Sequence, residues 1–318
     1  MKISIALTTH NGSRFLRQQL DSLFEQTRLP DEIVVCDDCS TDDTLAILRE
    51  YARQHPELRI HTNEHALGVN ANFFKAIALC TGDYISICDQ DDVWMSHKVA
   101  TLADELSAIE ESGRCAVVSS LRQDVDAEGH PIAPPQHFSA GKRWHDTLIN
   151  TEQSQGCTMM MNRAAATLAL EYYRQKPDAN LVMYDVLIAC LAAVFGIKSN
   201  LDQPLMYYRH HDANIVDKLR KKKKTFWEKV HEMPTYYPFL HDYRISELAV
   251  IDAITTDSPM PSDIRRFLHT MTLLNNTESI FMGLPLVLRL PQLSLKRRLC
   301  VLILTPMVKT LKIIKRCL

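Results

Sequence analysis

Short apolar runs alternate with longer stretches of helical periodicity through the first 120 residues. The runs are rich in β-branched residues, which indicates buried strands, and they occupy 2–7, 32–36, 58–62, 84–88 and 115–119. Between the first two runs, apolar residues recur at the spacing of one helical face, at Phe15, Leu16, Leu20, Leu23 and Phe24. A second helix is expected to follow a cap at Ser40 or Thr41. This alternation predicts an α/β fold with a mostly parallel sheet flanked by helices.

Polar residues gather directly after three of the predicted strands. They are the residues 8–11, Asp37 with Asp38, and the triplet Asp89, Asp91 and Asp92. Ligands of such sheets bind beyond the carboxyl ends of the strands. Three carboxylates this close repel one another unless a cation lies among them, and Mg²⁺ or Mn²⁺ prefers oxygen ligands together with substrate phosphates. The sequence therefore predicts a divalent cation and a diphosphate ligand at this edge.

Asp185 is the only acid in the apolar helical run NLVMYDVLIACLAAVFG. It either faces a cavity, where it can act as a general base, or lies on the surface near a helix start, where aspartate is common. The Met run in QGCTMMMNRAAA, at 155–166, is expected to belong to the core.

Composition narrows the class of protein. The 318 residues carry a net charge of −2, which argues against a protein that coats nucleic acid. Nine cysteines without clustered spacing suit reduced thiols in a cytosol, and Cys36 in the lone CDDC is expected to be a buried thiol. The N-terminus turns polar too early for a signal peptide, and no apolar stretch approaches the roughly 20 residues that cross a bilayer.

The last hundred residues carry concentrated positive charge. KLRKKKKTFW begins at Lys218, and after Leu286 there are eight lysines and arginines with no acid. At 307–318 the apolar and basic residues fall on different sides of a helical wheel, which is typical of a helix lying in a membrane interface. The alternatives are a solvated helix packed on the first part of the chain, or a tail that binds RNA.

Four segments in the order TTHN, EIVVCDDCSTDDT, GVNANFFKAI and GDYISICDQDDVW, within residues 3–105, resemble glycosyltransferase family 2. These are inverting nucleotide-sugar enzymes with the GT-A fold, a Rossmann-like arrangement. Two positions depart from the family pattern: His10 stands where the family often has Tyr, and Cys39 where it often has Gly. The second departure leaves the geometry of that turn open.

The resemblance implies a role for each residue it covers. Asp89 and Asp91 form the metal-binding DxD element with His211 as a further ligand, although a lone histidine is often structural. Asp185 is the general base, and Asp92 has the alternative role of capping the next helix. The donor is expected to be bound by Thr8, His10, Asn11, Asp37, Asp38, Asn72, Asp89, Gln90 and Arg209, the last within the family-like YYRHHDAN segment.

The resemblance also implies an organisation and an activity. A GT-A domain at 1–215, with a donor half at about 1–120 and an acceptor half at about 121–215, precedes a helical, basic, membrane-associating region at 216–318. With Mn²⁺ or Mg²⁺, the enzyme would transfer a sugar from a UDP-hexose or dTDP-rhamnose donor to a lipid-linked (polyprenyl diphosphate) saccharide. That places it in O-antigen or capsule biosynthesis, cytoplasmic and peripheral on the inner face of the plasma membrane, with no nucleic-acid partner.

Two other functions are alternatives to this one, and the sequence argues against both. Asp89 to Val93 also matches the D-x-D-x-V nucleophile loop of haloacid-dehalogenase-type phosphatases, but no pair of adjacent aspartates follows residue 92, as those enzymes require. The second is an inactive membrane scaffold that kept the fold, against which stands the presence of every expected carboxylate.

Overall fold

A computed structural model describes residues 1–111, 113–135, 147–148, 155–176, 182–212, 247–275 and 285. The chain divides into two compact units, Met1–Leu219 and Arg220–Leu318.

The first unit is built on a mixed sheet of eight strands in the order β3-β2-β1-β4-β7-β6-β8-β5. β1 to β4 are parallel, β7 runs antiparallel to both of its neighbours, and β5 runs antiparallel to β8. The predicted strands are all present, in a sheet that is parallel through its first four strands and mixed beyond them. Their bounds are β1 Ile3–Thr9, β2 Glu32–Asp37, β3 Leu58–Thr62, β4 Tyr84–Cys88, β5 Val93–Trp94, β6 Ala116–Val125, β7 Met159–Asn162 and β8 Ile197–Arg209.

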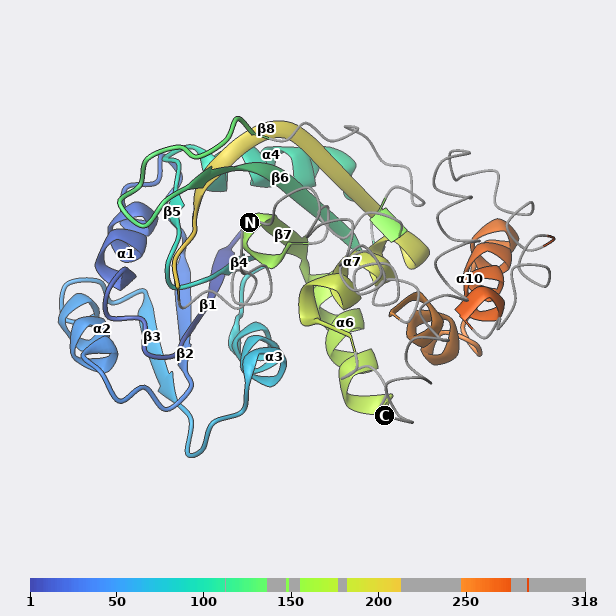
Figure 1. Cartoon of the computed structure of the whole chain (residues 1–318), viewed down its shortest axis with the longest axis horizontal. Helices are drawn as coiled ribbons and strands as arrows, with labels where there is room; N and C mark the ends of the chain where they lie inside the picture. Colours follow the sequence, from blue (N-terminus) through green and yellow to red (C-terminus); the bar gives the residue numbers. More distant parts are fainter. Residues whose placement is uncertain are drawn as a thin grey trace, which may run out of the picture. The chain divides into compact units, whose positions relative to one another are not determined.

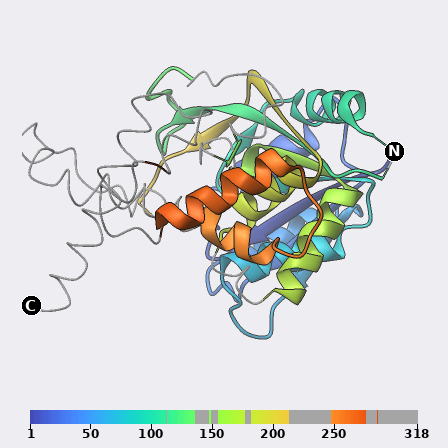
Figure 2. The same cartoon turned by 90° about the vertical axis from the view of Figure 1, so that its right-hand side faces the viewer.

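Helices cover both faces of this sheet, as the alternating pattern predicts. α1 (Leu16–Phe24), α2 (Thr44–Ala52) and α4 (Lys98–Ile109) contribute to one apolar cluster on one face. α3 (Val69–Leu79), α6 (Arg163–Gln175) and α7 (Tyr184–Phe195) lie on the other. Figure 1 shows α1 and α2 on one side of β1 to β3 and α3 on the other, and Figure 2 looks onto the face that carries α6.

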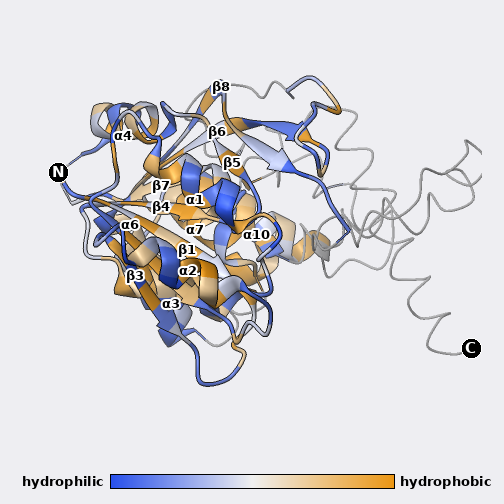
Figure 3. Ribbon diagram, turned by 90° about the vertical axis from the view of Figure 1, so that its left-hand side faces the viewer, coloured by the Kyte–Doolittle hydropathy of each residue, from blue (hydrophilic) through white to orange (hydrophobic). Residues whose placement is uncertain are grey.

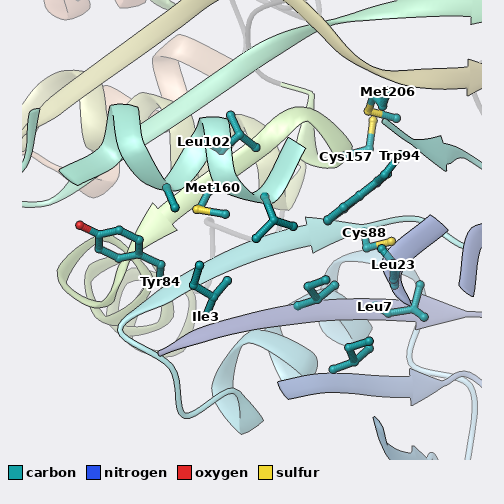
Figure 4. Close-up of a cluster of buried hydrophobic side chains, with 14 of the residues drawn as sticks. Ile3, Leu7, Leu23, Tyr84, Cys88, Trp94, Leu102, Cys157, Met160 and Met206 are labelled. Atoms are coloured by element: carbon teal, nitrogen blue, oxygen red, sulfur yellow. The ribbon is translucent and has the colours of Figure 1, made fainter. Parts of the chain in front are cut away.

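The core follows from the two-residue period of the strands. Ile3, Ile5 and Leu7 on β1 are fully buried beneath α1 and α4. Figure 4 shows Met160 of β7 between Leu102 of α4 and Ile3, with Leu7 farther along β1. Met159 to Met161 have no exposed surface, which confirms that the Met run belongs to the core. In Figure 3 the outward side of α1 is mostly hydrophilic, whereas α2 is of mixed hydropathy.

The cap predicted for the second helix is wrong. α2 begins at Thr44 after Asp43, whose side chain makes no capping hydrogen bond. Asp42 accepts the Thr44 amide instead, at 3.0 Å. Ser40 lies four residues before the helix, and its hydroxyl oxygen accepts the Asn11 amide at 2.9 Å instead of an amide of α2. The backbone amide of Thr41 donates to the Asn11 side chain.

In the second unit, residues 247–254 are helical and α10 spans Ser262–Asn275. The Thr272 hydroxyl of α10 donates to Asp252 of the preceding helix at 2.8 Å. Among the described residues, no helix combines the length and apolarity needed to cross a membrane. The basic segment that starts at Lys218 and the amphipathic pattern at 307–318 lie outside the described residues.

Candidate active site

The carboxyl ends of β2, β1 and β4 are adjacent because these strands neighbour one another in the sheet. Thr9 of β1 pairs with Asp37 of β2, and Leu7 pairs with Cys88 of β4. The polar residues that the sequence places after three separate strands therefore meet at one edge.

Asp37 is fully buried and organises the turn after β2. Its carboxylate accepts hydrogen bonds from the Thr9 hydroxyl at 2.7 Å, the Ser40 hydroxyl at 2.6 Å and the Ser40 amide at 2.9 Å. Both carboxylate oxygens are thus bound within the turn, so Asp37 stabilises the conformation of the turn after β2.

Asp38 fastens the loop before α3. Although burial opposes ionisation, hydrogen bonds from Leu67, Asn63 and Gly68 hold the pKa of Asp38 below its usual value, so its charge is stable here. Asn63 also donates to Asn72 at 2.9 Å, and Asn72 in turn donates to the carbonyl of Cys36. Asn72 is 3% exposed and holds α3 against β2.

The loop after β1 is tied to the acidic loop after β4. Gln90 exchanges hydrogen bonds with the backbone of His10, at 2.8 and 3.1 Å. Gly12 is required for this approach, because a Cβ there would lie 2.1 Å from the Gln90 amide oxygen. The His10 ring bonds the Asp38 carbonyl at 2.6 Å, and Asn11 accepts the Thr41 amide. Thr8 is half-buried within β1.

Asp91 pairs with a residue that lies 120 positions later. Its carboxylate is 2.8 Å from Nε2 of His211, whose ring packs on Phe15 with centroids 4.7 Å apart. Arg209, at the end of β8 and 3% exposed, donates to the carbonyls of Asp91 and Ala127 and to Gln18. Arg209 at the end of β8, and His211 two residues later, therefore both contact the acidic loop.

Asp89 and Asp92 face a buried group of ionisable side chains. Burial, together with the charges of Asp91 and Asp185, raises the pKa of Asp89 to about 7. Burial, Asp91 and Asp89 likewise raise the pKa of Asp92, which is 1% exposed. These shifts mean that the negative charge of the loop is poorly compensated by the protein alone.

Asp92 does not cap the next helix, which corrects that alternative. α4 begins at Lys98 after His97, whereas the Asp92 carboxylate accepts the backbone amide of Arg209 at 3.2 Å. β5 intervenes between Asp92 and α4, so the carboxylate turns inward.

Lys98 and Cys157 complete this group, and sequence analysis missed both. Lys98 is fully buried, lies 3.7 Å above the Trp94 ring and donates to the carbonyl of Cys157. Burial lowers its pKa to about 8, against the opposing effect of Cys157 and the carboxylates. Figure 4 shows Trp94, Cys157 and Met206 together above Cys88. The available signal was a lysine four residues after Trp94, which a helix start explains equally well.

The residues present fit a divalent cation. The second oxygen of Asp92 is buried without a hydrogen-bond partner in the part of the chain that the structure describes. Ligand atoms of Asp89, Asp92 and Cys157 lie within 4.8 Å of one another. This group differs from the predicted set of Asp89, Asp91 and His211, in which Asp91 and His211 form their own pair.

Asp185 lies in the first turn of α7 and binds Gly156, the residue before Cys157 of this acidic group. One carboxylate oxygen accepts the Gly156 amide at 3.1 Å and the other accepts the Val186 amide at 2.8 Å. The charge of Asp185 also helps to raise the pKa of Asp89. The Asp185 side chain is half-buried.

The fold and site define a GT-A-like protein, with an acidic loop at the carboxyl ends of parallel strands. The chain belongs to glycosyl transferase family 2, whose model matches residues 4–168, just over half of the 318 residues.

The chain is also similar to individual proteins. It is 28% identical over 232 residues to an uncharacterized protein of Mycobacterium tuberculosis, a match that covers 71% of this chain and 64% of that protein. It is 25% identical over 230 residues to the dTDP-rhamnosyl transferase RfbG of Shigella flexneri, covering 66% and 73% respectively. The structure of residues 1–349 of S. aureus TarS in complex with UDP-GlcNAc aligns with a TM-score of 0.58 and 16% identity, over 98% of this chain and 92% of that one, which shows a shared fold.

Proposed function

We propose that this protein is a metal-dependent, inverting glycosyltransferase that moves a hexose or deoxyhexose from a nucleotide-diphospho-sugar to a saccharide acceptor. The observation that carries the proposal is that Asp185 of α7 accepts the amide of Gly156, the residue before Cys157, whose ligand atom lies within 4.8 Å of those of Asp89 and Asp92. The Asp89 carboxylate suits a cation that binds diphosphate, and the Asp185 carboxylate suits an attacking hydroxyl.

The donor side of the proposal rests on charge and on relatives. A divalent cation among Asp89, Asp91 and Asp92 would stabilise the negative charge that develops on the departing diphosphate. Arg209 fixes the backbone of this loop, and Asp38 with Asn63 lines the adjacent edge. The names of similar proteins mention dTDP-rhamnose and UDP-GlcNAc, so uridine and thymidine nucleotides are the donors to test first.

Asp185 is proposed as the general base. It would accept the proton of the acceptor hydroxyl as that oxygen attacks the anomeric carbon from the side opposite the diphosphate, which inverts the configuration. Its two backbone hydrogen bonds fix the carboxylate orientation before substrate arrives.

The acceptor is proposed to be a lipid-linked saccharide of O-antigen or capsule type, met at the inner face of the membrane. Support comes from the sequence after Leu286, where basic residues without any acid accompany an amphipathic pattern at 307–318.

Isothermal calorimetry with Mn²⁺ and a panel of UDP- and dTDP-sugars tests the donor assignment. We expect Asp91→Ala to abolish metal-dependent binding, while Asp185→Ala retains binding and loses transfer. Asp83→Ala is the matched control, since Asp83 is an exposed aspartate beside the opposite end of β4. Intact transfer in either of the first two variants contradicts the assignment.

The two alternative functions give different results in the same experiments. Membership of the family argues against the phosphatase, which would release inorganic phosphate from monoesters and lose that activity in Asp89→Asn. A protein that binds no nucleoside diphosphate with Mn²⁺ and hydrolyses no nucleotide sugar would be the inactive scaffold.

A further inference from the structure

The start of α7, which carries Asp185, has no cap of its own. Met183 precedes the helix and its side chain makes no capping hydrogen bond. The first amides of any α-helix lack partners within the helix, so they need acceptors from elsewhere. At this helix the acceptor for the Tyr184 amide comes from a different element.

Asn70, in the first turn of α3, supplies that acceptor. Its Oδ1 accepts the Tyr184 amide at 2.9 Å, and its Nδ2 donates to the Val182 carbonyl at 2.9 Å. One side chain thus holds the backbone on both sides of Met183. The contact joins residues more than 110 positions apart, and the sequence around Asn70 does not predict it.

Phe73 reinforces the same junction from the same face of α3. It lies one turn after Asn70, and its ring stacks on Tyr184 with centroids 4.0 Å apart. On the other side of the helix start, a Cβ at Gly156 would lie 2.3 Å from the Tyr184 hydroxyl. Tyr184 is therefore held between α3 and Gly156, and the Gly156 amide is the group that binds Asp185.

The other end of this connection reaches the donor side of the site. The loop that leads into α3 is fastened by the amides of Leu67 and Gly68, which donate to Asp38 at the end of β2. α3 thus begins at a carboxylate of the donor edge and contacts the helix start that presents Asp185.

We propose that Asn70 is a positioning residue for Asp185: its amide holds the start of α7 so that the Asp185 carboxylate stays on the Gly156 amide and faces the acidic group. The inference rests on the proposed role of Asp185 as base. Without Asn70, the Tyr184 amide lacks an acceptor, and the Asp185 carboxylate in the same turn is drawn toward the helix end instead of the site.

Hydrolysis of the donor is the assay, because it needs no identified acceptor. Water replaces the acceptor hydroxyl: its oxygen bonds to the anomeric carbon, the bond to the diphosphate breaks, and the proton passes to Asp185. The substrate is the UDP- or dTDP-sugar that binds most tightly in the calorimetric panel with Mn²⁺, and release of nucleoside diphosphate is measured.

We expect Asn70→Ala to lower kcat at least tenfold while KM and the Kd for nucleoside diphosphate change less than twofold. Asn70→Asp keeps an acceptor for Tyr184 but has no donor for Val182, so its kcat should fall between those of Asn70→Ala and the parent. Val69→Ala changes the neighbouring, exposed residue of the same turn and should stay within twofold of the parent. Thermal unfolding tests whether each variant is folded. If Asn70→Ala does not fold, the kcat of Asn70→Asp tests the inference in its place.

Combining Asn70→Ala with Asp185→Asn separates positioning from a general structural role. If Asn70 acts through Asp185, the double variant loses no more activity than Asp185→Asn alone. A further loss, a kcat of Asn70→Ala within twofold of the parent, or a parallel loss of diphosphate binding overturns the inference. If Asp185→Asn keeps the parental kcat, the proposed base itself is wrong and the inference falls with it.

Discussion

At the scale of single residues, the site is shaped by side chains that hold other side chains. Sequence analysis identifies which carboxylates gather, because strand ends and charge are visible in it. It does not show that Asp37 accepts the Ser40 amide, or that Asn72 donates to the Cys36 carbonyl. Those contacts depend on which rotamer each side chain adopts against a neighbouring strand, and a one-dimensional pattern carries no such information.

Arg209 illustrates this role and gives a first prediction. Its guanidinium donates to the carbonyls of Asp91 and Ala127 and to Gln18, in a position that is 3% exposed. Arg209→Met leaves these acceptors unpaired, so we expect the free energy of unfolding to fall by about 2–4 kcal/mol. Nucleoside diphosphate should bind more weakly, since the Asp91 loop loses its brace. Urea denaturation and calorimetry measure the two effects.

Arg17→Met is the control for Arg209. Arg17 pairs with Glu50 on the surface, and both side chains are about half exposed. Such pairs contribute roughly 0–1 kcal/mol, so this variant should be nearly as stable as the parent. Equal losses in both variants would contradict a special role for Arg209.

Cys39 gives a second prediction, from the backbone. Its φ is +60°, in the left-handed region that favours glycine. The turn therefore keeps the conformation typical of glycine although cysteine occupies the position. An L-residue there costs roughly 1–2 kcal/mol, partly offset by the larger chain entropy of glycine when unfolded.

We expect Cys39→Gly to leave stability unchanged or to raise it by up to about 1 kcal/mol, and Cys39→Val to lower it by more than about 1 kcal/mol. The valine cost arises because a β-branched side chain crowds a left-handed backbone. Urea midpoints of the two variants test this, and a valine variant as stable as the parent would show that the turn tolerates branched residues.

At the scale of elements, the sequence predicts the strands and helices well and their partners less well. The strands at 32–36, 58–62 and 84–88 coincide with β2, β3 and β4 within a residue or two. The antiparallel direction of β7 and the inward turn of Asp92 were not predictable, because periodicity reports burial and not the direction of a neighbouring strand. Lys98 and Cys157 were missed for a similar reason, since α4 and the 156–158 turn meet only in three dimensions.

Asp42 joins two elements and gives a prediction about pH. It accepts the Thr44 amide at the start of α2 and the Ser13 amide in the loop before α1, both at 3.0 Å. Although partial burial opposes it, hydrogen bonds from the side chains of Thr44 and Ser13, together with those from their amides, lower the pKa of Asp42 to about 2 from its usual 3.8. A depressed pKa stabilises the folded state above the unfolded value, and this contribution is lost as the pH falls from about 4 toward 2.

We therefore expect the melting temperature of the parent to fall more steeply between pH 4 and pH 2 than that of Asp42→Asn. Asp43→Asn is the control for removing one negative charge, because the Asp43 side chain makes no capping hydrogen bond. Parallel melting curves for the parent and Asp42→Asn would show that Asp42 contributes nothing through its charge.

At the scale of the whole molecule, the candidate site lies within one unit. Every residue proposed to bind donor, cation or acceptor proton belongs to Met1–Leu219. The amphipathic segment and all of the basic segment except its first two residues, Lys218 and Leu219, belong to Arg220–Leu318. Donor chemistry and membrane attachment are therefore proposed to be separable properties. Removing the second unit should therefore preserve the binding of nucleoside diphosphate and abolish the binding to vesicles.

We expect the fragment 1–219 to bind nucleoside diphosphate with Mn²⁺ within a few-fold of the Kd of the full chain, because its sheet and all candidate ligands are retained.

The full chain should cosediment with vesicles that contain anionic lipid, and less so as salt is raised, since exposed charges are screened. The fragment should remain in the supernatant. A full chain in which Lys221 to Lys224 are replaced by Gln separates the two basic segments. Vesicle binding that survives this change must come from the residues after Leu286, where the sequence contains no acid. Vesicle binding by the fragment itself would place the membrane contact on the catalytic unit and contradict the division of labour proposed for the chain.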